Sequence, residues 1–363
     1  MKIKKPLILG AVASIALSTF AAVTPAFADP VAGSYVAVGS DTLDASMNAL
    51  ANGTKVTGST VRILANGATV GSFDAFGSAT IQTKSGGPYF QRPSGSGAGV
   101  NALIASIKGT TYGTPAVNIA GQVDIARSSS GPGTNADAAG KLIYVPYARD
   151  AVAYAYYGSS TDLGNLTAAQ LKGIYNGTIT TIGSTTVNAL IPQASSGTRK
   201  FFLSALGISS DASCPLAACT TSTLPENDAS VLTAGSIIPF SAANWIAQAN
   251  GVAQNTIPAS GNVVLGSPDG IAPYTGTGSS LVPSSTFYSA APWGRDTYLV
   301  VEYAHVDSTS ATYDATLAGL VDSTKATSLT NFSATLASQP GSVKKKYGFL
   351  APSTTTPQRA YTW

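Results

Sequence analysis

The chain is poor in the residues that support metal and covalent chemistry. Its 363 residues include one histidine, two cysteines and two methionines. A tetrahedral metal site needs about four such ligands, so we expect no metal and no cofactor. The lone His305 stands in a strand-like run, which favours a structural role. Neither a Gly-x-Ser-x-Gly elbow nor a phosphate loop ending in Gly-Lys-Ser/Thr is present, which argues against an enzyme.

Charge is also scarce, because only 10% of the residues are charged. The net charge is +3, and Lys2, Lys4 and Lys5 account for all of it, since 3 − 3 = 0. Apart from those three, the only basic run is 344–346, which is typical of a solvated helix end. Nucleic-acid binding requires a clustered basic face. The sequence therefore predicts no nucleic-acid partner.

The N-terminal segment has the pattern of a cleavable signal peptide. Basic residues precede a mostly apolar run, 6–20, and Ala26-Phe27-Ala28 is a small-x-small cleavage site. The apolar run is shorter than the roughly 20 residues of a membrane span, so a membrane anchor is the weaker alternative. We expect a signal peptide over 1–28 and a secreted, extracytoplasmic protein. No cysteine stands at the cleavage site to carry a lipid.

Two cysteines, Cys214 and Cys219, flank a short Pro-Leu-Ala-Ala segment. Exported proteins keep such pairs oxidised, so we expect a disulfide between them. Closing so short a loop stabilises by only about 2 kcal/mol.

Strand-like and helix-like runs alternate along the remaining chain, which predicts an α/β fold, and the length suits two domains. Predicted strands lie at 34–39, 142–145, 151–157 and 297–303. Predicted helices lie at 41–51, 95–108, 167–175, 196–206 and 241–249.

Four loops share small residues, hydroxyl groups and backbone amides at or near a helix start: 39–42, 92–99, 124–130 and 195–199. The first turn of a helix leaves backbone N–H groups unpaired, and the helix dipole favours an anion there. Arginine adds a fork of donors that matches an oxyanion. Each loop alone is an ordinary helix cap, but four together predict one buried oxyanion site.

At these loops the chain resembles the phosphate-binding proteins of bacterial phosphate ABC importers, most closely an actinobacterial-like branch. The resembling segments are 92–103 (Arg-Pro-Ser-Gly-Ser-Gly-Ala-Gly-Val-Asn-Ala-Leu), 166–177, 191–198 (ending Ser-Gly-Thr) and 238–247. The resemblance implies a type 2 periplasmic-binding-protein fold, with a ligand cleft between two lobes and two crossovers. We expect lobe 1 to comprise 29–143 plus 298–363, and lobe 2 to comprise 144–297.

The resemblance also implies ligand-binding residues. The matching positions are Thr42 with the backbone N–H of Leu43, then Ser94 or Ser96, then Ser196, Gly197 and Thr198. The third loop adds Ser128 or Ser129, with Arg127 as the main cation.

Two positions depart from the family pattern. Ser129 stands where the family commonly has an aspartate that accepts a proton of phosphate, and Pro192 stands where it has an arginine. Arg127, Arg149 or Arg199 would then supply the cation. Phosphate is the first candidate ligand, with sulfate or a phosphate ester as the alternatives.

The expected protein is a monomeric solute-binding protein that passes its ligand to an ABC permease. A secreted anion-binding or phosphate-ester-binding surface module without a transporter is the alternative. A hydrolase of phosphate esters is less favoured, because no catalytic motif is evident.

Overall fold

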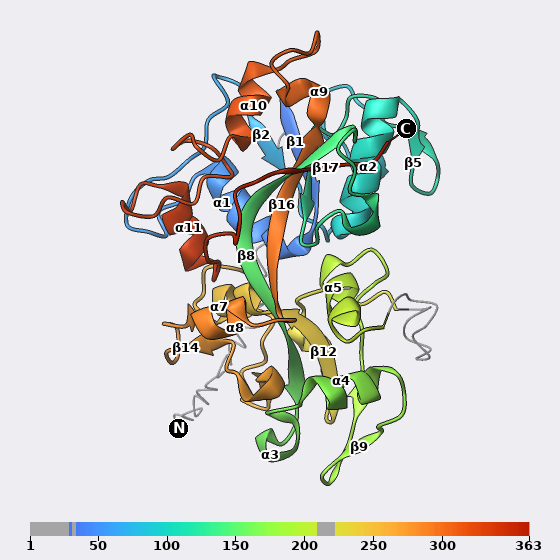
Figure 1. Ribbon diagram of the computed structural model, residues 1–363, viewed down its shortest axis with the longest axis vertical. Helices are drawn as coiled ribbons and strands as arrows, with labels where there is room; N and C mark the ends of the chain where they lie inside the picture. The colour runs from blue at the N-terminus through green and yellow to red at the C-terminus, as the bar shows by residue number, and fades with distance from the viewer. Residues whose placement is uncertain (1–28, 31–33, 209–221, 363) are drawn as a thin grey trace, which may run out of the picture.

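One mixed β-sheet runs through the whole molecule in the computed structural model, which describes residues 29–30, 34–208 and 222–362. Nine strands of the described chain form this sheet, in the order β11-β12-β8-β16-β7-β1-β2, with β13 and β17 also paired to β8. Helices pack around it in an upper and a lower half (Figure 1). The α/β class and the type of fold expected from the sequence are confirmed. Residues 1–28 and the pair Cys214 and Cys219 lie outside the described residues.

The strands of the main sheet are β1 (Tyr35–Gly39), β2 (Val70–Ser72), β7 (Ile125–Ser128), β8 (Leu142–Tyr157), β11 (Asn188–Ala189), β12 (Ser236–Ser241), β13 (Val263–Leu265), β16 (Gly294–Glu302) and β17 (Gln358–Ala360). The other strands are two residues long and form four separate two-stranded sheets. They pair β3 (Thr80–Ile81) with β4 (Phe90–Gln91), β5 (Thr111–Tyr112) with β6 (Val117–Asn118), β9 (Thr181–Ile182) with β10 (Thr185–Thr186), and β14 (Tyr274–Thr275) with β15 (Val282–Pro283).

The helices of the described chain are α1 (Asp44–Asn52), α2 (Ser96–Lys108), α3 (Ser160–Leu163), α4 (Ala168–Tyr175), α5 (Gly197–Ala205), α7 (Ala242–Ala249), α8 (Ser285–Ser289), α9 (Tyr303–Val306), α10 (Ala315–Val321) and α11 (Pro340–Lys346). Short 3-10 helices are η1 (Asp41–Leu43), η2 (Gly133–Asn135), η4 (Ala229–Val231) and η5 (Pro268–Gly270).

Two long antiparallel strands, β8 and β16, connect the halves. The sequence predicts two separate strands at 142–145 and 151–157, but the structure has one continuous strand, β8. The charged pair Arg149-Asp150 interrupts the apolar pattern, and its partners on β16 allow the strand to continue through it. Figure 1 shows β8 and β16 passing side by side from the upper to the lower half.

The buried apolar side chains form separate clusters above and below this connection. One cluster is drawn from residues between Ala151 and Trp293. The other two come from residues up to Ala148 and from Tyr298 onward, together with Ala243 and Ala247 of α7. Both predicted lobe boundaries, after 143 and after 297, fall inside β8 and β16, so they stay a prediction.

Several helices begin where a strand has just ended. β1 and β7 are parallel, so their carboxyl ends, Gly39 and Ser128, lie at the same edge of the sheet. The predicted helix at 167–175 begins with a capping box, in which the side chain of Thr167 accepts from Gln170 N. Ser196 and Ser241 cap α5 and α7 in the same way. This arrangement brings helix N-termini together near the middle of the sheet.

His305 differs from the expectation of a strand, because it lies in the short helix α9, which directly follows β16. Its Nε2 is 3.5 Å from Glu302 of the preceding turn, and the side chain is 39% exposed. Among the described residues, no helix has the length and apolar character needed to cross a membrane.

Helix α2 reaches the end of β1 through two glycines. A Cβ on Gly99 would lie 2.6 Å from the Cα of Gly39 and 3.1 Å from the oxygen of Val38. Gly39 itself has a φ of +117°, which side chains rarely adopt. This close approach sets the distance between η1 and the start of α2.

We predict that Gly99→Ala lowers the free energy of unfolding by about 1–3 kcal/mol, because the added methyl overpacks a backbone contact. Urea denaturation of the purified protein measures this change. Gly97→Ala is the matched control in the same helix turn, since its nearest contact, to Ser195 O, is 3.6 Å away. An equal loss in both variants would contradict the steric explanation.

Candidate functional site

Two Arg-Asp ion pairs join the neighbouring strands β8 and β16. The antiparallel register sets Arg295 opposite Asp150 and Asp296 opposite Arg149. The Arg295 Nη2 and Nε atoms lie 2.7 and 3.0 Å from Asp150 Oδ2. Because neighbouring residues of a strand point to opposite faces, the Arg149–Asp296 pair lies on the other side of the sheet. The Asp150–Arg295 ion pair is almost completely buried.

Asp150 is held in place from the lower half of the molecule. Its Oδ1 accepts hydrogen bonds from Ser241 Oγ at 2.9 Å and from the backbone N–H of Ala243 at 3.1 Å, at the start of α7. A helix N-terminus stabilises a carboxylate. The aspartate is thereby fixed, and it orients the guanidinium of Arg295.

The Nη2 atom of Arg295, which pairs with Asp150, also contacts hydroxyl groups from both halves of the molecule. It lies 2.9 Å from Thr198 Oγ1 and 3.3 Å from Thr42 Oγ1, and the two hydroxyls are 3.4 Å apart. The Nη1 atom of Arg295 is buried and has no hydrogen-bond partner among the described residues. Such an orphaned charged donor is costly in a folded protein unless a ligand satisfies it.

Three further predicted residues meet beside this group. Ser96 Oγ is 3.1 Å from Ser129 Oγ and accepts a hydrogen bond from Ser129 N at 2.9 Å. A Cβ on Gly197 would collide with both serine oxygens, so the backbone at the start of α5 touches them directly. We call Thr42, Ser96, Ser129, Gly197, Thr198 and Arg295 the polar cluster. All its residues are buried, and they come from five separate parts of the chain.

A carboxylate lies next to the polar cluster at the start of α5. Glu226 Oε2 accepts from the hydroxyl of Ser196, at 2.5 Å, and from Thr198 N, at 3.1 Å. Ser196 Oγ also caps α5 by accepting from Arg199 N. Ser196 is therefore brought to the site as predicted, but its hydroxyl already donates to Glu226.

Three other predicted residues support the cluster without pointing a side chain into it. Leu43 follows Thr42 in η1, and its side chain is buried in the upper core. The carbonyl of Ser94 accepts from Ser195 Oγ, and Ser94 forms a bridge with Gly39. Ser128 Oγ donates to Ser130 O at 2.7 Å, within its own loop. Of the pairs left open by the sequence, the structure favours Ser96 and Ser129.

Arg127 does not reach the polar cluster, contrary to the expectation that it is the main cation. Its Nη2 forms an ion pair with Asp44 and donates to Phe73 O at 2.6 Å. Its Nη1 donates to Ser72 Oγ at 2.7 Å, and its Nε donates to Ser40 O at 3.3 Å. The side chain is fully buried. Arg127 therefore fastens β2, α1 and the loop that carries Thr42.

The two alternative cations are also engaged elsewhere. Arg149 donates to Tyr288 O and pairs with Asp296. Arg199 donates from Nη1 to Pro192 O at 2.9 Å. The cation in the cluster is Arg295, which sequence reasoning missed. The available signal was a pair of Arg-Asp dipeptides, 149–150 and 295–296, each inside an otherwise apolar strand-like run.

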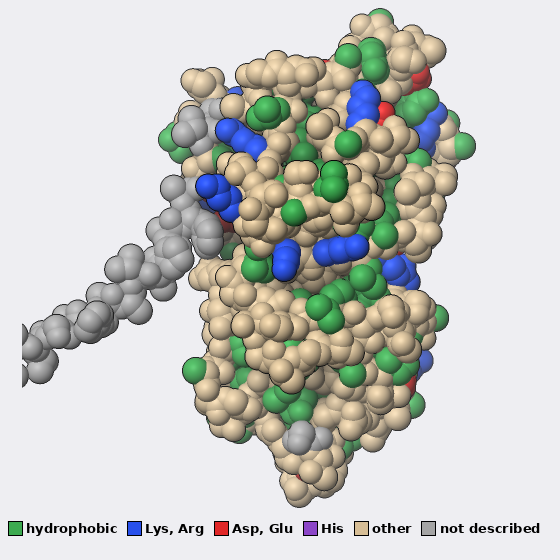
Figure 2. Space-filling view, turned by 90° about the vertical axis from the view of Figure 1, so that its left-hand side faces the viewer, with side chains coloured by type: hydrophobic (Ala, Val, Ile, Leu, Met, Phe, Trp, Pro, Cys, Tyr) green, Lys and Arg blue, Asp and Glu red, His purple; other side chains and the backbone are tan. Residues whose placement is uncertain are grey.

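A small cavity of about 80 Å³ borders the cluster on one side. Ser96, Ser196, Gly197 and Lys200 are among its lining residues. Figure 2 shows the side of the molecule that lies on the left of Figure 1, where Lys and Arg side chains lie along the boundary between the upper and lower halves.

We predict that Arg127→Ala destabilises the fold, because it leaves Asp44 buried without its partner. Breaking a buried ion pair costs about 3–5 kcal/mol, and urea denaturation measures it. The control is Lys84→Ala, which breaks the more exposed pair with Asp124 and should cost at most about 1 kcal/mol. If Arg127→Ala keeps full stability and loses anion binding, Arg127 is a ligand-facing cation after all.

Residues 6–334 match the model of a protein family described as a PBP superfamily domain. No curated protein matches the chain. Solved structures similar to it include an ABC-type phosphate transport receptor from Vibrio cholerae, with 17% identity, a TM-score of 0.48, and coverage of 88% of this chain and 100% of that one. A phosphate-binding protein from Stenotrophomonas maltophilia has 15% identity, a TM-score of 0.46 and coverage of 88% and 91%. A human phosphate-binding apolipoprotein has 15% identity, a TM-score of 0.47 and coverage of 88% and 91%. Because the family model spans nearly the whole sequence, the chain belongs to the periplasmic-binding-protein (PBP) superfamily.

Proposed function

We propose that this protein is an extracytoplasmic solute-binding protein that holds inorganic phosphate, or a group that contains it, at the polar cluster. The observation that supports this most is the buried Arg295, whose Nη1 has no partner among the described residues while its Nη2 contacts Thr42 and Thr198. A buried, oriented and incompletely paired guanidinium is suited to an oxyanion.

The hydroxyl groups of the cluster supply the remaining donors. Without a ligand they bond to one another, as Thr42 does with Thr198 and Ser96 with Ser129. Hydroxyl groups rotate, so the same oxygens can donate to an anion instead. Charge-assisted hydrogen bonds contribute about 1.5–3 kcal/mol each. A few of them reach the roughly 8 kcal/mol of micromolar binding after the cost of association.

The origin of the donors links binding to the arrangement of the halves. Thr42, Ser96 and Ser129 precede β8, whereas Gly197 and Thr198 follow it, and Arg295 lies on β16. An anion that contacts both sets stabilises the arrangement that holds them together. This is the behaviour expected of a receptor that closes on its solute, and it requires no catalytic group.

The finer parts of the proposal follow from the sequence and the similar proteins. The Vibrio cholerae protein is described as a receptor for ABC-type phosphate transport. We propose delivery to an ABC permease, export by the signal peptide at 1–28, a disulfide between Cys214 and Cys219, and a monomer. Arg149 and Arg199 are left out of the proposed ligand set, and Arg127 is kept only as a structural support.

We predict that Arg295→Gln weakens phosphate binding about ten- to hundred-fold, because one charge-assisted contact of about 1.5–3 kcal/mol is lost. Isothermal titration calorimetry of the mature protein with phosphate measures it. The double variant Asp150→Asn/Arg295→Gln serves if the single variant is unstable, since it leaves no unpaired buried carboxylate at this position.

Arg149→Gln is the matched control, because it breaks the neighbouring ion pair of the same two strands on the opposite face. Its affinity for phosphate should stay within about two-fold of wild type, which is an energy of less than roughly 0.5 kcal/mol. Unchanged phosphate binding in folded Arg295→Gln would refute the role of Arg295. Absence of phosphate binding in the wild-type protein would refute the proposed function itself.

A further inference from the structure

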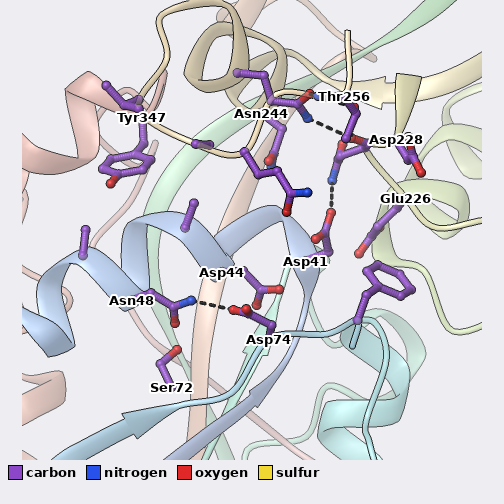
Figure 3. A pocket seen from close by; sticks show the side chains of 18 of the residues that line it. Asp41, Asp44, Asn48, Ser72, Asp74, Glu226, Asp228, Asn244, Thr256 and Tyr347 are labelled. Atoms are coloured by element: carbon purple, nitrogen blue, oxygen red, sulfur yellow. Dashed lines mark hydrogen bonds between the residues drawn. The ribbon is translucent and has the colours of Figure 1, made fainter. Parts of the chain in front are cut away.

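A large acidic cavity adjoins the polar cluster. Its volume is about 730 Å³, within the range of small-molecule sites. Carboxylates and amides line it, and neither lysine nor arginine is among its lining residues: Asp41, Asp44, Asp74, Glu226, Asp228, Asn48, Asn227, Asn244 and Gln248 contribute. We call it the acidic cavity. Figure 3 shows the carboxyl groups of Asp41, Asp44, Asp74 and Glu226 gathered in its middle.

Glu226 gives the acidic cavity an unsatisfied acceptor. The residue is 2% exposed, yet its Oε1 has no hydrogen-bond partner among the described residues. Its other oxygen is fixed by Ser196 and Thr198 at the start of α5. In Figure 3 the carboxyl group of Glu226 points toward Asp41, whose own carboxyl group accepts from Asn227. A buried acceptor without a donor indicates a missing donor in the space that it faces.

The protonation state of the Asp41 carboxyl group depends on the charges in this cavity. Burial, with a further contribution from Glu226, raises the pKa of Asp41 to about 8, and Asp74 acts in the same direction. The hydrogen bond from Asn227 and the charge of Arg127 oppose this increase. Asp41 therefore keeps its proton at neutral pH, and a cation bound nearby would displace that proton.

The acidic cavity and the polar cluster are continuous. Asp41 directly precedes Thr42 in η1. Asn227 Nδ2 donates to Asp41 Oδ2 at 2.9 Å and approaches Thr42 Oγ1 at 3.4 Å. Glu226 contacts Thr198 directly. A ligand of a few atoms can therefore place one end in the cluster and the other in the cavity.

We propose that the acidic cavity binds the ammonium group of a ligand whose phosphate or phosphonate group is held by the polar cluster, so that the preferred solute is a short aminoalkyl phosphate or phosphonate. This inference rests on the proposed function at the polar cluster. Its basis is the orphaned Glu226 oxygen and the carboxylates of the lining.

The charges explain why such a ligand is preferred over a bare anion. Glu226 lies close enough to the cluster to repel an oxyanion that brings no positive charge or proton, and Asp41 adds to this repulsion once it has lost its proton. An ammonium group a few bonds from the oxyanion reverses that repulsion and supplies donors to Glu226. Carboxylates next to the anion site thus favour ligands that carry an ammonium group over bare anions.

The direct test compares two ligands that differ only in the amine. We expect 2-aminoethylphosphonate to bind the wild-type protein at least ten-fold more tightly than ethylphosphonate, in calorimetric titrations at pH 8. The ratio should increase between pH 6 and pH 9, because the Asp41 carboxyl loses its proton over this range and the resulting carboxylate attracts the ammonium. Because the ammonium group lowers the second pKa of the phosphonate that carries it, each affinity is corrected for the dianion fraction of its own ligand before the ratio is taken.

Glu226→Gln and Asp74→Asn should each reduce this ratio about three- to ten-fold. Inorganic phosphate should bind Asp74→Asn as well as, or better than, it binds wild type. Asp137→Asn, a substitution of an exposed carboxylate outside the acidic cavity, is the matched control and should leave the ratio unchanged. Unequal stability of the variants does not affect a ratio measured on the same protein.

The outcomes separate this inference from the function on which it rests. If phosphate binds and both phosphonates bind equally, the ammonium site is refuted and the oxyanion site stands. If neither phosphate nor any phosphonate binds, the proposed function fails as well. A titration with Ca²⁺ tests whether the acidic cavity binds a metal ion instead. The described residues contain no group of three or more potential ligands arranged for a metal ion, so we expect no saturable Ca²⁺ binding. Saturable Ca²⁺ binding that is abolished by Glu226→Gln would overturn the ammonium assignment.

Discussion

The ion pair between Asp150 and Arg295 is the interaction on which the rest of the site depends. It joins β8 and β16, the two strands that pass through both halves of the molecule (Figure 1). Its carboxylate is held by the start of α7, and its guanidinium extends to hydroxyls from η1 and α5. Burying two charges is expensive unless their remaining hydrogen bonds are satisfied. Asp150 is fully satisfied and Arg295 is not, so the pair holds a positive charge in place for a ligand.

A second buried ion pair, Arg127 with Asp44, has the opposite character. Each nitrogen of Arg127 has an acceptor in the protein, so no donor remains for a ligand. Its carbonyl acceptors come from Ala37, Ser40 and Phe73, around the loop that carries Thr42. The two arginines therefore have different roles. Arg127 fixes the backbone that presents the hydroxyl groups, and Arg295 supplies the positive charge.

The elements and most of the donors could be predicted from the sequence, because both are local. Helix starts such as Ser96 and Ser196 follow from small and hydroxyl residues before an apolar periodicity. The location of the cation could not be predicted in this way. Arg127 immediately precedes a run of serines that reads as a loop in the sequence, which favoured it, although the structure places it in β7. Arg295 reaches the site only through strand register, a long-range property. Glu226 and the acidic cavity depend likewise on which distant loops the sheet brings together.

The most direct test of this account is a crystal structure of the mature protein with bound phosphate. The account predicts a phosphate oxygen within hydrogen-bond distance of Arg295 Nη1, and others contacting the hydroxyls of Thr42, Ser96 and Thr198. Phosphate bound against Arg127, or against Lys200 at the surface with Arg295 contacting only Asp150, would contradict it.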